Sequence, residues 1–105
     1  MDKLEYKIDG FEGPLDLLLY LISKNKLDIT DIKLTVLVDQ YIEQIRLMQL
    51  NDMDVASEFL EMAARLVYLK TVSLLPVHEE ADELKRELTG ELIEYRDCKL
   101  MAEKL

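Results

Sequence analysis

Alternating apolar and polar residues near the amino end of the chain predict one short strand. Leu4, Tyr6 and Ile8 fall on one side of residues 4–9, and charged residues fall on the other, a period of two that is typical of β-strands. This is nearly the only such signal in the sequence. Because a lone strand leaves backbone donors and acceptors unpaired, we expect it either to lie across helices as an arm or to pair with another chain.

The next apolar run predicts a helix over about residues 14–24. Pro14 suits the first position of a helix, where its missing N–H is not needed. The shared apolar face consists of Leu15, Leu18, Leu19 and Ile22. Leu17 and Leu21 point elsewhere, so the helix is apolar on nearly all sides and must be covered on more than one of them. We expect a central core helix, with the alternative that part of it meets another protein.

Helical spacing resumes near residues 27–32 and continues to about residue 50, which predicts a second helix. Asp28, Thr30 or Asp31 can cap its amino end, because their side-chain oxygens accept hydrogen bonds from the first free N–H groups. The apolar positions that recur every three or four residues are Leu34, Leu37, Val38, Tyr41, Ile42, Ile45 and Met48.

A further apolar period predicts a third helix over about residues 54–75. Asn51, Asp52 and Asp54 can cap its start, and Pro76 stops it. One stripe is typical of a core face and consists of Val55, Phe59, Met62, Leu66 and Leu69. The opposite face is expected to be solvated and consists of Glu58, Glu61, Arg65 and Tyr68.

A second apolar stripe lies beside the core stripe of the same helix. Its members are Ala56, Leu60, Ala63, Val67 and Leu74. A surface helix needs an apolar arc of only about 100°, so this second stripe is available to a partner. The small Ala56 and Ala63 would let another helix approach closely. Lys70 falls inside the arc, where its charge either snorkels to solvent or pairs with an acid.

Residues 79–105 predict a long last helix. Acidic residues at its start suit the helix dipole, and Gly90 weakens its middle by roughly 1 kcal/mol. Its apolar stripe consists of Leu84, Leu88, Leu92, Ile93, Tyr95 and Leu100. The pattern continues without a stop signal, so we expect the chain to be part of a longer protein. The fold class predicted is all-α, with three to four helices, a short extended amino-terminal arm and a long carboxy-terminal helix.

The composition fits one compact domain and opposes direct contact with nucleic acid. The chain has 105 residues, half of them hydrophobic, enough for a core without metals or disulfides. Its 22 acidic and 13 basic residues give a net charge of −9, which opposes binding to a phosphate backbone. The single cysteine, and an acidic start that is unlike a signal peptide, favour a reducing cytoplasm.

No group of residues suggests a catalytic or metal site. His78 is the only histidine, and Cys98 has no histidine nearby in the sequence, so neither suits a nucleophilic or metal centre. Residues 79–83 include four acids, but they lack the spacing of a calcium loop. Neither glycine-rich phosphate-binding motif occurs. We therefore predict that the domain is not an enzyme and uses no cofactor or metal.

Two motif blocks resemble the amino-terminal domain of segregation and condensation protein A, the bacterial and archaeal kleisin. The first block consists of FEGPLDLLLYLI at residues 11–22, DI at 28–29 and 31–32, and QYI at 40–42. The second is DVASEFLEMAARLVYLKTVSLLP at residues 54–76, which is similar to the family's long helix with its K-S/T-x-x-LLP ending. The resemblance is dense over residues 6–76 and thinner over 77–105.

The resemblance implies a non-enzymatic subunit of a condensin-like complex that acts in chromosome condensation and segregation. In the family, this domain binds the coiled-coil neck of one structural-maintenance-of-chromosomes (SMC) ATPase. A carboxy-terminal winged-helix domain, absent from this chain, binds the head of another, and the segment between carries a dimer of segregation and condensation protein B (ScpB). Residues 1–76 would then form the neck-binding domain, and residues 77–105 a helical extension toward the linker. DNA would be contacted only through the complex, in the cytoplasm at the nucleoid, with no membrane partner.

The resemblance and the free stripe together select the candidate residues. The predicted contacts with the SMC neck are Ala56, Leu60, Ala63, Val67, Lys70 and Leu74. The predicted structural core is Leu15, Leu18, Leu19, Ile22, Tyr41, Phe59 and Leu66. We also expect that the isolated chain can self-associate through its exposed stripe. The alternative function is a DNA-binding helical domain of the helix-turn-helix type, which the net charge opposes.

Overall fold

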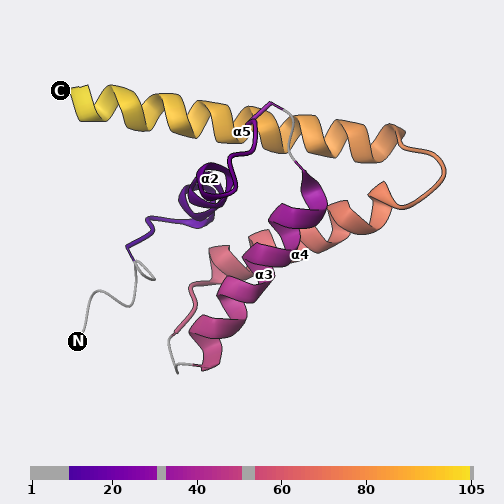
Figure 1. Ribbon diagram of the computed structural model, residues 1–105, viewed down its shortest axis with the longest axis horizontal. Helices are drawn as coiled ribbons and strands as arrows, with labels where there is room; N and C mark the ends of the chain where they lie inside the picture. The colour runs from indigo at the N-terminus through magenta and orange to yellow at the C-terminus, as the bar shows by residue number, and fades with distance from the viewer. Residues whose placement is uncertain (1–9, 31–32, 51–53, 105) are drawn as a thin grey trace.

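The computed structural model describes residues 10–30, 33–50 and 54–104, and these residues form four helices and no strand (Figure 1). The helices are α2 (Pro14–Lys24), α3 (Leu34–Leu50), α4 (Ser57–Ser73) and α5 (Glu79–Lys104). The predicted all-α fold with a long last helix is confirmed. The strand predicted over residues 4–9 lies outside the described residues.

The helices pack around one core. In Figure 1, α3 and α4 run antiparallel side by side, and α5 turns back across one end of this pair. α2 lies against both α3 and α5 and has a smaller contact with α4. The largest fully buried side chains come from all four helices and are Leu17, Leu18, Leu37, Tyr41, Met48, Phe59, Leu66, Leu69, Leu88 and Leu92.

α2 has the predicted bounds, but its buried face differs from the predicted one. The buried aliphatic residues are Leu17, Leu18, Leu21 and Ile22. Leu17 and Leu21, which lie off the predicted face, are thus buried as well. Because α3 and α5 both pack against α2, the expectation that this helix is covered on more than one side is confirmed. Leu15 and Leu19 pack at the edge of the core and are only partly buried.

α3 begins later than the predicted caps would place it. Asp28 uses Oδ1 to accept hydrogen bonds from the N–H (2.9 Å) and the hydroxyl (2.7 Å) of Thr30, and these bonds lower the pKa of Asp28. The two residues thus form a local turn that precedes the helix, and α3 starts at Leu34. Their predicted role as caps is wrong, because the turn satisfies their side chains. Asp31 lies outside the described residues.

α4 is shorter than the predicted 54–75 at both ends. It starts at Ser57 with Ala56 at the N-cap, and no side chain caps it there. Asp54 precedes this position and does not act as the predicted cap; the other two candidates, Asn51 and Asp52, lie outside the described residues.

One buried hydrogen bond joins α3 to α4 at the centre of the fold. The Tyr41 hydroxyl donates to the backbone carbonyl of Phe59 at 2.8 Å. Burial raises the pKa of Tyr41, because the charged phenolate would lose its hydration there. The phenol therefore stays neutral and fixes the register of the two helices.

The second half of α5 is held to α2 by a polar cluster, which we call the clasp (Glu12, Asp16, Tyr95 and Lys99). The Lys99 ammonium donates to Asp16 Oδ1 at 2.6 Å, and the Tyr95 hydroxyl donates to Glu12 Oε1 at 2.9 Å. Asp16 Oδ2 also accepts the Glu12 backbone N–H at 3.1 Å. Asp16 is only 8% exposed, so its charge is compensated by a cation and a backbone donor as burial requires.

None of the described helices combines the length and hydropathy that a membrane-spanning segment needs. This holds for α5 in particular, the longest of them, whose sequence is rich in charged residues.

Candidate partner-binding surface

The outward face of α4 carries large apolar side chains that nothing in the described chain covers. Leu60 is 42% exposed, Val67 48% and Leu74 77%. These three lie along the second stripe predicted from the sequence. Exposed aliphatic side chains that follow one helix face are more informative than scattered ones, because together they form a continuous surface that a partner can bury.

The other three predicted contacts lie at the margin of this face, next to α3. Ala56 and Ala63 are partly buried and pack against the core. The Lys70 ammonium forms an ion pair with Asp39 of α3 at 2.9 Å. Of the two alternatives for Lys70, pairing with an acid is therefore the one observed. The six residues thus lie along one side of α4, but only Leu60, Val67 and Leu74 are exposed apolar groups.

The opposite margin of α4 is held by α5, which corrects the prediction of a wholly solvated face. The Arg65 guanidinium makes two hydrogen bonds to the Glu91 carboxylate, at 2.9 and 2.7 Å, and these lower the pKa of Glu91. The Tyr68 hydroxyl donates to Glu80 Oε2 at 2.7 Å, which raises the pKa of Tyr68. The sequence pattern of α4 alone could not show that α5 returns along this side. Glu58 and Glu61 are exposed as predicted.

Sequence reasoning missed three exposed, uncharged residues of the same face, Ser57, Ala64 and Thr71. Ala64 and Thr71 are exposed beside Leu60 and Val67. Thr71 donates its hydroxyl to the Val67 carbonyl at 2.9 Å, so its polar group is satisfied within the helix. The signal that could have found them is the absence of charge, since an exposed helix face normally carries charged residues.

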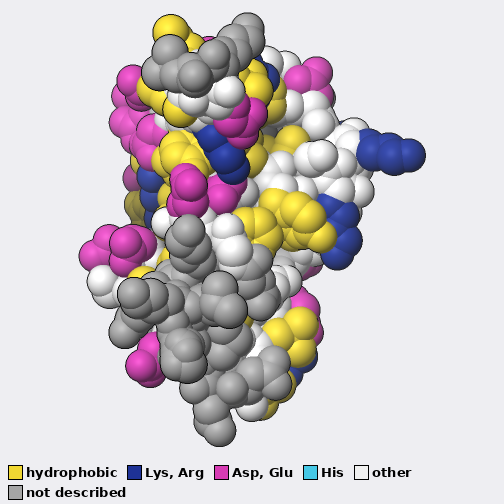
Figure 2. All heavy atoms as spheres, turned by 90° about the vertical axis from the view of Figure 1, so that its left-hand side faces the viewer, with side chains coloured by type: hydrophobic (Ala, Val, Ile, Leu, Met, Phe, Trp, Pro, Cys, Tyr) yellow, Lys and Arg dark blue, Asp and Glu magenta, His cyan; other side chains and the backbone are white. Residues whose placement is uncertain are grey.

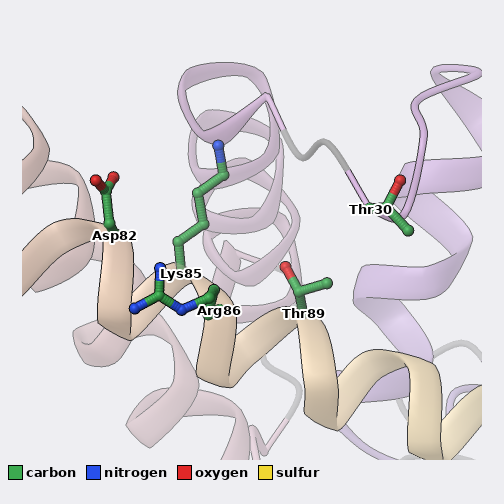
Figure 3. Close-up of a pocket in the computed structure, with 5 residues that line it drawn as sticks. All are labelled: Thr30, Asp82, Lys85, Arg86 and Thr89. Atoms are coloured by element: carbon green, nitrogen blue, oxygen red, sulfur yellow. The ribbon is translucent and has the colours of Figure 1, made fainter.

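The described residues show no arrangement suited to catalysis or metal binding. His78 and Cys98 are exposed, and no three His, Cys, Asp or Glu residues are grouped to hold a metal in the part of the chain that is described. A depression of about 280 Å³ lies beside the start of α5 and is lined by Thr30, Asp82, Lys85, Arg86 and Thr89. Figure 3 shows that the Lys85 and Arg86 side chains extend in different directions rather than converging on one point.

The charge distribution does not favour a nucleic-acid surface. On the face drawn in Figure 2, acidic side chains lie around small apolar areas, and the Lys and Arg side chains are separated from one another. No continuous basic patch is visible among the described residues of that face, and the whole chain has a net charge of −9.

Comparisons with known proteins agree on one family. The family model described as Segregation and condensation protein ScpA matches residues 21–105. Curated relatives with the name segregation and condensation protein A include that of Caldanaerobacter subterraneus subsp. tengcongensis, 47% identical over 94% of this chain and 43% of the relative. Those of Exiguobacterium sibiricum (45% identical, 94% of this chain, 43% of the relative) and Bacillus subtilis strain 168 (44%, 100%, 45%) are similar. The chain thus spans less than half the length of these relatives. It belongs to the segregation and condensation protein ScpA family.

Proposed function

We propose that this chain is the part of a non-enzymatic kleisin subunit that binds the coiled-coil neck of an SMC ATPase, and that it acts in chromosome condensation and segregation. Membership of the ScpA family supports the process. The neck assignment follows from the resemblance described above. In this proposal the chain bridges two SMC heads together with the part of the protein beyond residue 105.

The observation that carries the proposal is the exposed apolar face of α4. A coiled-coil neck consists of helices, and an amphipathic helix is a natural partner for them. Leu60, Val67 and Leu74 are large enough to contribute substantially on burial, and α4 is anchored from both sides, by Asp39 of α3 and Glu91 of α5. The surface is therefore presented on a helix that packs against both α3 and α5.

The remaining parts of the proposal concern the regions at either end. Residues 1–76 are the neck-binding domain, supported from beneath by α2. Residues 77–105 lead toward the linker that carries the ScpB dimer, and the exposed Leu100 and Met101 near the end of α5 are suited to that contact. DNA is reached only through the complex, because the chain is acidic.

Isothermal titration calorimetry with a cognate SMC head-plus-neck fragment tests the proposal. We expect saturable binding of this chain to that fragment and no binding to a head without the neck. The two SMC fragments differ only in the neck, which is the proposed docking site. A difference in binding between them is therefore due to the neck and not to another SMC surface. Equal binding to both fragments, or binding to neither, would contradict the proposal.

A further inference from the structure

The exposed, uncharged residues of α4 follow a heptad spacing. They form what we call the α4 seam and are Ser57, Leu60, Ala64, Val67, Thr71 and Leu74. Successive members are separated by three, four, three, four and three positions, which is the alternation of a and d sites in a coiled coil. All six are exposed, and Leu74, the residue after α4, keeps a right-handed helical backbone. The whole seam therefore has one helical geometry.

This spacing specifies the geometry of the partner. A mean repeat of 3.5 residues keeps a seam facing a second helix only if the two wind around each other with a left-handed supercoil. At about 1.5 Å per residue, the seam extends over roughly 26 Å. A partner helix of about five turns would cover it.

The chemistry of the seam suits burial against another helix. None of its six residues is charged, and the Thr71 hydroxyl is already satisfied by the Val67 carbonyl. Ala64 lies between Leu60 and Val67, where its short side chain leaves room for a large side chain of the partner. A partner that buries this face therefore removes no charged group from water, and the Thr71 hydroxyl keeps its hydrogen bond.

Charge argues for a partner other than a second copy of this chain. Each copy has a net charge of −9, so two copies repel each other. Beside the seam, Glu58 and Glu61 of α4 are exposed, whereas Lys70 on the other margin is neutralised by Asp39. The complementary partner carries basic residues along the flank that lies next to Glu61.

We propose that the α4 seam is the docking line for one helix of a partner coiled coil, with apolar a and d residues and a basic flank. This rests on the proposed function and deepens it, because it assigns the register of the contact. This register differs from the contacts predicted from the sequence. The centre of the interface moves from Ala63 and Lys70 to Ala64 and Thr71.

Four single substitutions in the 105-residue chain test the register, with the SMC head-plus-neck fragment as the probe. Ala64→Glu and Thr71→Glu place a charge in the seam, and we expect each to weaken binding by about 100-fold or more. Lys70→Gln removes the ion pair of Lys70 with Asp39, which lies beside the seam. Ala102→Glu adds a negative charge, as the seam variants do, at an exposed alanine of α5. We expect both to change the dissociation constant by less than about threefold. Circular dichroism and thermal unfolding confirm that each variant is folded.

The outcomes separate this inference from the proposed function. Loss of binding in the seam variants alone supports the register. Wild-type binding to the neck together with normal binding of both folded seam variants overturns the register and leaves the proposed function standing. Failure of the wild-type chain to bind the neck overturns both. Thr71→Glu is an independent second variant, so the test does not depend on Ala64→Glu folding correctly.

Discussion

The buried charge of Asp16 and the half-buried charges of Arg65 and Glu91 have specific partners, and in each pair one partner lies on α5. Lys99 compensates Asp16 on α2, and Glu91 receives two hydrogen bonds from Arg65 on α4. The two pairs differ in burial, since Asp16 is almost inaccessible while Arg65 and Glu91 are about one third to one half exposed. We therefore expect different costs when each is broken.

Asp16→Asn is expected to lower the free energy of unfolding by about 1–2 kcal/mol. The amide keeps the size of the side chain but removes the charge that holds Lys99. Urea unfolding followed by circular dichroism measures the change. Asp97→Asn is the matched control, because the pair of Asp97 with Arg96 is exposed and contributes little. Equal stability of the two variants would show that the ion pair of Asp16 with Lys99 contributes nothing to the fold.

The pair of Glu91 with Arg65 makes stability depend on acid pH. Hydrogen bonds from Arg65 lower the pKa of Glu91 below its ordinary value of 4.5. The unfolded chain therefore takes up the proton first as the pH falls. The stabilisation is complete above pH 4.5 and is lost as the pH drops through the lowered value. Glu91→Gln should reduce stability by less than about 1 kcal/mol at pH 7. The difference from the wild type should shrink in acid, and a difference that grows there would contradict this sign.

At the scale of the elements, α5 shows that packing outweighs local propensity. Gly90 lies in the middle of this helix and does not interrupt it, because Leu88 and Leu92 on either side are fully buried. The expected weakening by glycine is a free-energy cost that the packing of these leucines offsets.

Gly90→Ala is expected to stabilise the domain by roughly 1 kcal/mol. The site is exposed, and a β-carbon there would meet no atom within 4 Å. The gain comes from the lower backbone entropy of alanine in the unfolded chain. Thermal unfolding of the two proteins measures it. A lower melting temperature for the variant would mean that the glycine has a conformational role.

Element types and most element bounds could be predicted from the sequence, whereas contacts between distant helices could not. The bounds of α2 could be predicted from Pro14 and the leucines that follow it, because the proline favours a helix start and the leucines recur with a helical period. The clasp could not be found, since Glu12 and Tyr95 carry no joint signal in the sequence. The exposed part of α4 was predicted only in part, because the choice between Ala63 and Ala64 depends on where α3 packs.

At the scale of the whole molecule, the charge balance predicts how the domain meets DNA. With a net charge of −9, the chain should not retard duplex DNA in an electrophoretic assay even at low salt, where phosphate contacts are strongest. The comparison is the assembled complex with SMC, which should retard it. A shift with this chain alone would favour the helix-turn-helix alternative over a role through partners.

The clasp also has a consequence for the order in which the domain forms. Its side-chain contacts join residues 83 positions apart, so the whole segment from Glu12 to Lys99 must have left the ribosome before both contacts can close. The hairpin of α3 and α4 is closed by contacts over shorter separations, 18 residues for Tyr41 with Phe59 and 31 for Asp39 with Lys70, and closing the longer loop has the larger entropic cost. We therefore expect the end of α5 to attach last. Asp16→Asn should then speed unfolding and leave the folding rate nearly unchanged, and stopped-flow measurements of a slowed folding rate would contradict this order.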